Sequence, residues 1–323
     1  MVLLTGATGF VGQHLCDNLL QQGYALKALL RPDSKIDALK SYPKVQQVLA
    51  NPFNIESMKE AFDKVEFIIH CAGVLKGLKY EDYYQGNVLY TANLIQTAKT
   101  YAPHLKKFIF ISSQAVIGPS TLDFPKKEGD LPNPISFYGK TKLEAEQKII
   151  QSGLPYIILR PSSIYGPKDH EFLPLFKMAK KGILTLPGNG KNVLNLIYVQ
   201  DFINAILASL KSSQVNKTYH VCGGGIYSQK EVAQTALKIS QKKGVIVKIP
   251  AFLAKGFGYF NTFLGKIRGK PFLLNHQKIK EALQKAWIMD CSKISQETNY
   301  QPQVLLEQGF LQTYQWYQEE GWL

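Results

Sequence analysis

Tyr138 and Lys142, four residues apart, are the two side chains in this sequence whose types and spacing best suit chemistry. On a helix, this spacing places both side chains on one face. A free tyrosine has a pKa of about 10, and a neighbouring ammonium group lowers that pKa because it favours the phenolate. Such a pair suits general acid–base work on an alcohol or a ketone. Exposed Tyr/Lys pairs at this spacing are also common on helices, so the prediction needs further residues to support it.

Two serines, Ser112 and Ser113, follow the apolar segment 107–111. If that segment is a parallel strand, its carboxyl end faces the ligand crevice of an open α/β sheet. A hydroxyl group there can hydrogen-bond the oxygen of a reacting carbonyl. Serines after a strand also form ordinary turns, so only the company of Tyr138 and Lys142 makes a catalytic role the better interpretation.

Three glycines, Gly6, Gly9 and Gly12, follow the apolar residues 2–4 and precede the amphipathic segment 13–22. A strand, a glycine-rich turn and a helix in this order can hold a pyrophosphate at the helix N-terminus. Gly6 allows the tight turn, Gly9 lets the backbone approach phosphate, and Gly12 lets the helix pack close to the strand. The spacing is G-x-x-G-x-x-G rather than the commoner G-x-G-x-x-G, and its context predicts a nucleotide site.

Apolar segments of strand length alternate with helical patterns through the first half of the chain. The expected strands are 2–5, 25–30, 47–49, 67–71, 107–112 and 156–160, and the expected helices are 11–22, 56–63, 81–101 and 137–151. This alternation predicts an α/β fold with a doubly wound parallel sheet. After Pro161 the pattern becomes irregular and predicts a smaller, mixed lid. We expect a nucleotide-binding domain over 1–165, to which 195–212 returns, and a substrate-binding domain over 166–194 and 213–323.

The composition bounds the class of protein. With 323 residues, 45% of them hydrophobic, the chain can bury a large core. Its four cysteines are scattered without a C-x-x-C pair, which fits a reducing compartment and predicts no metal site. The first strand begins next to Met1 and no apolar run reaches the ~18 residues of a membrane span. We therefore expect a cytoplasmic protein, with association with a membrane surface as a further prediction.

Positive charge is concentrated in one tract. The chain has 38 Lys and Arg against 24 Asp and Glu, a net charge of +14, and residues 232–280 contain ten basic and no acidic residues. Within it, 251–267 has a broad apolar helical face with Lys255 and Lys266 on the opposite side. This pattern is typical of a helix that faces a core. The alternative is a lid over an apolar substrate that also rests on an anionic membrane.

The motifs occur together in the order found in one family, and the sequence resembles an extended short-chain dehydrogenase/reductase of the NAD-dependent epimerase/dehydratase superfamily over nearly its whole length. The matching pieces are TGATGFVG at 5–12, HCAG at 70–73, Asn87, Ser112-Ser113, Tyr138 with Lys142, LRPSSIYGP at 159–167 and IYVQD at 197–201. The pattern is most similar to the 3β-hydroxysteroid dehydrogenase and dihydroflavonol reductase-like branch. The resemblance implies a Rossmann-type sheet.

The resemblance also implies roles for individual residues. Tyr138 would be the general acid/base, Lys142 would lower its pKa and hold the nicotinamide ribose, and Ser113 would orient the substrate oxygen. Asp201 would be a structural anchor, and a homodimer would form through 81–101 and 137–151. The implied cofactor-binding residues are Gly6, Thr8, Gly9, Phe10, Val11, Gly12, Cys71, Ala72, Gly73, Asn87, Ser112, Tyr138, Lys142, Pro161, Ser162, Ser163 and Ile164.

The choice of dinucleotide depends on the end of the second expected strand. No acid stands there to accept the ribose 2′-hydroxyl of NAD; Arg31, helped by Lys35, would instead pair with a 2′-phosphate. NADP is therefore predicted over NAD. Asn51-Pro52 stands where the family often has Gly-Asp near the adenine, and Asn51 can hydrogen-bond an adenine amine.

Three functions compete. The first is an NADP-dependent oxidoreductase that interconverts a ketone and a secondary alcohol on an apolar small molecule; the second is a nucleotide-sugar epimerase or dehydratase. Similar sugar enzymes carry Asp-Glu where Gln114-Ala115 stands, Asn at Ser163 and Arg at Leu194, so the first function is favoured. The third is a non-catalytic regulatory or RNA-binding member of the fold. Because Tyr138 and Lys142 are both retained, nucleic-acid binding is not expected.

Overall fold

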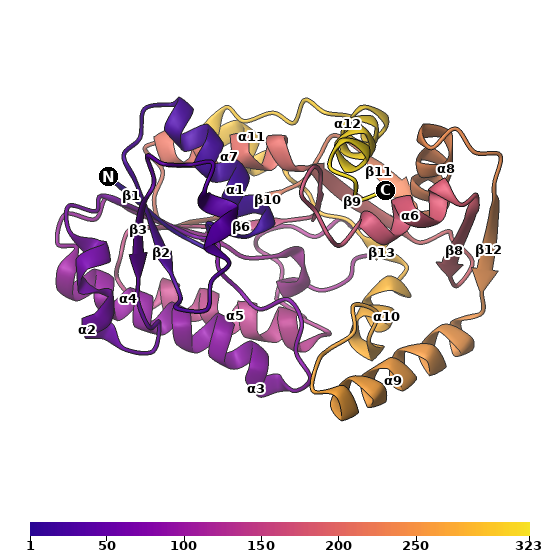
Figure 1. Ribbon diagram of the computed structural model, residues 1–323, viewed down its shortest axis with the longest axis horizontal. Helices are drawn as coiled ribbons and strands as arrows, with labels where there is room; N and C mark the ends of the chain where they lie inside the picture. The colour runs from indigo at the N-terminus through magenta and orange to yellow at the C-terminus, as the bar shows by residue number, and fades with distance from the viewer.

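The computed structural model describes residues 1–323 and is built around a seven-stranded parallel sheet (Figure 1). The strand order is β10-β6-β5-β4-β1-β2-β3, so the order reverses between β1 and β4, where a ligand crevice opens in folds of this kind. The strands are β1 Val2–Thr5, β2 Leu26–Leu30, β3 Gln46–Leu49, β4 Phe67–His70, β5 Lys107–Ile111, β6 Tyr156–Pro161 and β10 Lys217–Val221. The predicted Rossmann-type sheet is confirmed.

Helices cover both faces of this sheet. In Figure 1, α1 (Phe10–Gln21), α7 (Val199–Lys211) and α11 (Ser292–Thr298) lie on one side, and α2 (Ile55–Met58), α4 (Tyr90–Tyr101) and α5 (Phe137–Ile150) on the other. Successive residues of β1 show why the strands are apolar throughout. Val2 and Leu4 belong to a cluster of 44 buried residues on the α1 side, while Leu3 belongs to a cluster of 19 on the α4 side. A strand covered on both faces needs continuous apolar residues.

The smaller part of the molecule is mixed, as predicted. One sheet contains β7 (Ser163–Tyr165), β9 (Val193–Tyr198), β11 (Ile226–Ser228) and β13 (Ala286–Trp287), and a second contains β8 (Ile183–Pro187) and β12 (Val245–Ile249). The helices are α6 (Leu173–Lys180), α8 (Gln229–Ile239), α9 (Ala251–Arg268), α10 (His276–Ala282) and α12 (Leu306–Glu319). Helix α8 begins at the capping box formed by Ser228 and Glu231.

After the loop that follows β4, the chain forms a continuous helix with a change of pitch. A short α3 (Tyr80–Tyr83) is followed by the π-helix η3 (Tyr84–Leu89), which runs directly into α4. Short 3₁₀ turns lie at η1 (Ile36–Leu39), η2 (Lys59–Phe62) and η4 (Gln114–Val116). π-helical turns are rare and often occur at functional sites.

The border between the two parts differs from the prediction. Helix α7 packs on the seven-stranded sheet as expected for 195–212, but β9 pairs with β7, β11 and β13 instead. The seventh strand of the large sheet is β10, which lies inside the range 213–323 assigned to the substrate-binding domain. Strand β9 is mostly apolar and β10 is mostly polar, and neither pattern reveals which neighbour the strand pairs with.

The cysteines also differ from expectation. Cys222, at the end of β10, and Cys291, just before α11, form a disulfide across 69 residues of chain, whereas Cys16 and Cys71 are free. The expectation of a reducing compartment rested on their scatter along the chain. Scatter does not exclude pairing, because the fold brings distant segments together. None of the helices combines the length and apolar character that crossing a bilayer requires.

Candidate active site

A cleft of about 600 Å³ lies along the carboxyl ends of β1, β2, β4, β5 and β6. Every predicted site residue except Lys35, Asn51 and Asn87 lines it. Those that do are Gly6, Thr8, Gly9, Phe10, Val11, Gly12, Arg31, Pro52, Cys71, Ala72, Gly73, Ser112, Ser113, Tyr138, Lys142, Pro161, Ser162, Ser163 and Ile164. Residues from seven separate segments of the chain therefore converge on one cavity.

The glycine turn at one end of the cleft has no room for side chains. Gly6 has φ 74°, and a Cβ on Gly6 would lie 2.7 Å from the amide nitrogen of Ala72. A Cβ on Gly12 would lie 2.0 Å from the carbonyl oxygen of Gly6. Gly9 begins α1 without a side-chain cap, so the first amide groups of the helix are free for an anion. This cradle fits the pyrophosphate of a dinucleotide.

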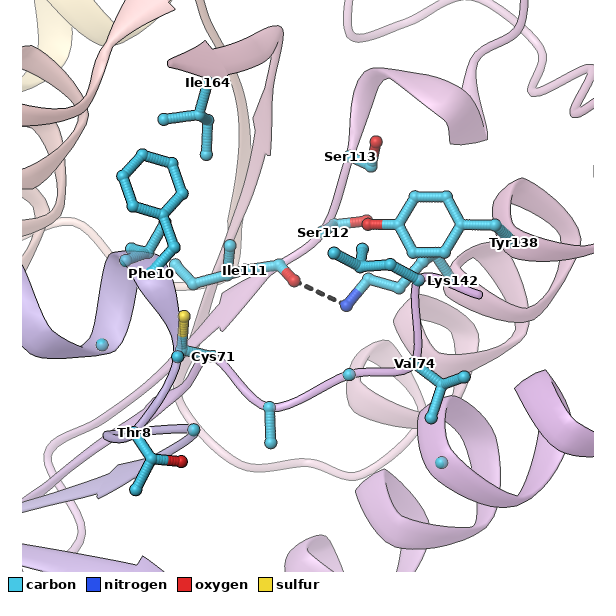
Figure 2. Close-up of a pocket in the computed structure, with 18 of the residues that line it drawn as sticks. Thr8, Phe10, Cys71, Val74, Ile111, Ser112, Ser113, Tyr138, Lys142 and Ile164 are labelled. Carbon is cyan, nitrogen blue, oxygen red and sulfur yellow. Dashed lines mark hydrogen bonds between the residues drawn. The ribbon is translucent and has the colours of Figure 1, made fainter. Parts of the chain in front are cut away.

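The start of α5 brings Tyr138 to Ser113. The Ser136 hydroxyl caps the helix by accepting a hydrogen bond of 3.1 Å from the amide of Gly139. A Cβ on Gly139 would lie 2.4 Å from the carbonyl oxygen of Ala115, so the helix packs directly on the chain after β5. Figure 2 shows the Tyr138 ring beside Ser112 and Ser113, at the edge of the cleft. The predicted serine–tyrosine pair is thus assembled by local packing.

The Lys142 side chain reaches under this pair to the end of β5. Its Nζ donates a hydrogen bond of 2.6 Å to the carbonyl oxygen of Ile111 and lies 3.9 Å from the centre of the Phe110 ring (Figure 2). Burial lowers the pKa of Lys142 to about 7, against smaller raising effects of Cys71 and Glu146. The amine is therefore held in the cleft with one donor already committed to the backbone.

Lys278, on α10, is the charged residue with the largest effect on the pKa of Tyr138. Burial raises the pKa of Tyr138 to about 12, and the Lys278 ammonium and the Ser113 hydroxyl oppose that rise. Lys278 Nζ lies 5.9 Å from the centre of the Tyr138 ring and 3.2 Å from the Glu281 carboxylate. We expected Lys142 to favour the phenolate; the cation whose charge opposes the rise in the pKa of Tyr138 is instead Lys278.

Lys278 was missed because no motif marks it and it follows Tyr138 by 140 residues. It lines the main cleft and also an adjoining pocket of about 260 Å³. Ser113 and Tyr138 line both cavities as well. The other residues that line this pocket are Gln114, Ala115, Ser163, Asn192, Val193, Leu194, Gln229, Glu281, Ala282, Gln284 and Trp287. A substrate in this pocket would reach the hydroxyl groups of Ser113 and Tyr138.

Three predicted cofactor residues lie elsewhere. Asn87, inside the π-helix, is buried; its Oδ1 accepts a hydrogen bond from the Val74 amide (2.7 Å), and its Nδ2 donates to Val74 O (3.1 Å) and Thr141 Oγ1 (3.0 Å). It therefore fixes the Gly73–Val74 turn to α5. Asn51 is exposed and its Oδ1 accepts from the Phe53 amide, and Lys35 is exposed beyond the cleft. The turn hydrogen bond holds the Asn51 side chain, and neither Asn51 nor Lys35 lines the cavity.

Two further residues act as anchors. The Ser112 hydroxyl donates to the buried Glu146 carboxylate, which also forms an ion pair of 2.7 Å with Arg160. This network joins β5, α5 and β6 beneath the cleft.

Asp201 is buried and accepts hydrogen bonds from the amides of Gln303 and Val304, so its predicted structural role is confirmed.

Comparison with known proteins agrees with this geometry. The model of the NAD dependent epimerase/dehydratase family matches residues 2–222. The sterol-4-alpha-carboxylate 3-dehydrogenase (decarboxylating) of Bos taurus is 30% identical over 67% of this chain, although the match spans 63% of that relative, less than two thirds of its length. The UDP-glucose 4-epimerase of Vibrio cholerae is 28% identical over 97% of this chain and 94% of its own.

Among solved structures, the UDP-glucuronic acid 4-epimerase of Bacillus cereus in complex with NAD superposes with a TM-score of 0.80 at 23% identity, over 99% of both chains. This likeness extends the shared fold from the first 222 residues to the whole molecule. The glycine cradle, the Ser113–Tyr138–Lys142 group and the family match agree: the chain belongs to the NAD-dependent epimerase/dehydratase family.

Proposed function

We propose that this protein is an NADP(H)-dependent oxidoreductase that interconverts a ketone and a secondary alcohol on an apolar small molecule. The observation that carries the proposal is the position of Ser113 and Tyr138 between the dinucleotide cleft and the adjoining pocket. A nicotinamide dinucleotide held in the cleft would supply the hydride for reduction of the carbonyl carbon. Tyr138 gives its proton to the carbonyl oxygen while Ser113 hydrogen-bonds that oxygen, and oxidation reverses both transfers.

The residues around the pocket support this reaction over sugar chemistry. Gln114 and Ala115 follow Ser113, so no acid pair stands there to expel water, and the Gln114 amide instead donates to Ser163 at 3.3 Å. Leu194 lines the pocket at a position where sugar enzymes that resemble this chain place an Arg. A diphosphate in this pocket would lack that charge-assisted contact.

One observation favours a nucleotide-sugar epimerase as the second candidate. The side-chain oxygens of Gln114 and Gln229 are buried, have no hydrogen-bond donor, and belong to residues that line the adjoining pocket. Buried acceptors are normally satisfied, and substrate hydroxyl groups would satisfy them. The same two oxygens fit an apolar substrate that carries a hydroxyl or amide group near the reacting carbon.

A screen of substrates by the absorbance of reduced nicotinamide separates the two functions. We expect consumption of NADPH with at least one apolar ketone from a set of steroids, flavonoids and long-chain 3-oxo compounds. UDP-glucose should give neither net redox change nor UDP-galactose by chromatography. Conversion of UDP-glucose to UDP-galactose, with no ketone reduced, would establish the second candidate instead.

Replacing Lys278 with Met is expected to shift the pH dependence of alcohol oxidation to higher pH. Oxidation needs the Tyr138 phenolate, and the Lys278 ammonium favours that form by lowering a pKa that burial raises. Without this cation a smaller fraction of Tyr138 is phenolate at any pH below its pKa. If the lost charge interaction is worth ~1.4 kcal/mol, kcat/KM at neutral pH should fall about tenfold. The measurement is kcat/KM against pH.

Two control variants accompany this experiment. Lys278→Arg keeps the charge and should keep the pH profile, and Lys280→Met removes an exposed cation that lines neither pocket. The other groups whose charge acts on Tyr138, Glu281 and Cys71, stay in place in all three variants. A profile for Lys278→Met that coincides with that of the parent would contradict a role for this cation.

A further inference from the structure

Helix α9 lies at the rim of the smaller part of the molecule, with α10 beside it (Figure 1). The face that packs against the protein consists of small residues, because Ala254, Gly258, Asn261 and Gly265 are its buried positions. A Cβ on Gly258 would lie 3.1 Å from the Cα of His276, so the two helices approach closely. Asn261 reinforces this contact by donating a hydrogen bond of 2.9 Å to the carbonyl oxygen of Leu274.

The outer face of α9 is apolar and exposed. Seven of the 23 large hydrophobic side chains that the whole chain exposes lie on this one helix, each of them between 53% and 72% exposed. They are Phe252, Leu253, Phe257, Tyr259, Phe260, Phe263 and Ile267. The interpretation of this segment as a helix whose aromatic face packs on a core is therefore wrong. Burying the small residues leaves the large ones pointing away from the protein, and a concentration of exposed apolar groups marks an interaction surface.

Cations border this apolar face. At about 100° per residue, Lys255 and Lys266 fall on one side of it, Arg268 falls on the other, and all three are exposed. The surrounding tract 232–280 contains ten basic and no acidic residues. A second copy of the chain would bring two such tracts together, and their like charges would repel. An anionic surface has the complementary charge.

We propose that α9 docks this enzyme on an anionic lipid surface. The aromatic and aliphatic side chains enter the boundary between headgroups and acyl chains, and Lys255, Lys266 and Arg268 meet the lipid phosphates, as in helices that lie in the plane of an interface. Helix α10, on which α9 packs, carries Lys278 and Glu281 into the pocket next to Tyr138. An apolar substrate dissolved in the lipid would thus have a short path to the active site.

Cosedimentation with vesicles tests this proposal. At low salt, the parent protein should sediment with phosphatidylcholine vesicles that contain phosphatidylserine, and high salt should release much of it. A Phe252→Ser/Phe260→Ser/Phe263→Ser variant should bind about tenfold more weakly or worse, because three aromatic groups that enter the lipid are lost. A Lys255→Glu/Lys266→Glu variant should lose the dependence on phosphatidylserine.

The matched control replaces three exposed apolar residues elsewhere, Leu122, Phe124 and Leu131, with Ser and should bind as the parent does. Dinucleotide binding and thermal unfolding of each variant show that the fold is kept, since none of these residues lines the cleft. Absence of binding to anionic vesicles at low salt would overturn the proposal. So would dimerisation in analytical ultracentrifugation that the aromatic variant abolishes, because a second copy would then cover this face.

Discussion

A Tyr138→Phe variant is expected to lose turnover by a factor on the order of 10²–10⁴, the usual contribution of a general acid or base. The change removes only the hydroxyl group that donates the proton, and leaves the ring in its place on α5. At neutral pH a tyrosine whose pKa is raised to about 12 is protonated and ready to donate. Because Lys142 and the glycine cradle are untouched, dinucleotide affinity should stay nearly intact. Steady-state kinetics and a fluorescence titration of NADPH measure the two quantities.

Tyr101→Phe provides the matched control for this experiment. Its hydroxyl donates to Glu56 on the surface, and the residue lines neither the cleft nor the adjoining pocket, so turnover should be unchanged. If Tyr138→Phe turned over substrate as fast as the parent, the proton would have to come from another group and the proposed chemistry would be wrong.

The proposed preference for NADPH depends on Arg31, so an Arg31→Asp variant is expected to lose it. Arg31 follows β2 at the rim of the cleft, and Ser34, whose hydroxyl accepts a hydrogen bond of 3.0 Å from the Arg31 amide, lines the cleft beside it. A charge-assisted contact with the 2′-phosphate contributes about 1.5–3 kcal/mol, so KM for NADPH should rise roughly 10- to 100-fold. KM for NADH should fall, because a carboxylate at this position can accept the ribose hydroxyl.

The neighbouring cation supplies the control. Lys35 is exposed and does not line the cleft, so Lys35→Asp should change both KM values little. The Asp33 carboxylate lies 3.4 Å from Nε of Arg31 and forms an exposed ion pair with it. A parent protein that already uses NADH better than NADPH would show that Arg31 does not select the cofactor.

The sequence predicted the large sheet and the convergence of Ser113, Tyr138 and Lys142 on one cleft, because each depends on local patterns. Continuous apolar strands, the glycine turn, and the spacing of Tyr138 and Lys142 all act within a few residues of chain, and the six predicted strands end within one residue of those observed. Gly6 and Gly12 in particular are required, because a Cβ on either would lie only 2.0–2.7 Å from a backbone atom.

What the sequence did not reveal depends on contacts between distant segments. Lys278 reaches Tyr138 only because α10 packs across the pocket, and β10 joins the large sheet only because β9 has partners of its own. In α9 the helical periodicity placed the large apolar residues on one face, but it did not show which face of the helix packs against the protein. Large side chains usually face the core, and here the small residues do so because α10 lies too close for anything larger.

The π-helical turn that holds Asn87 limits how this protein can change in length as its sequence diverges. Surface loops accept insertions and deletions at little cost. In the π-helix of residues 84–89, by contrast, gaining or losing one residue between Asn87 and α4 would rotate Asn87 relative to α4, by about 100° at the α-helical pitch. Asn87 would then release Val74 and Thr141, and with them the turn that lines the cleft. The contacts of Asn87 therefore depend on the number of residues in this stretch as well as on their identity.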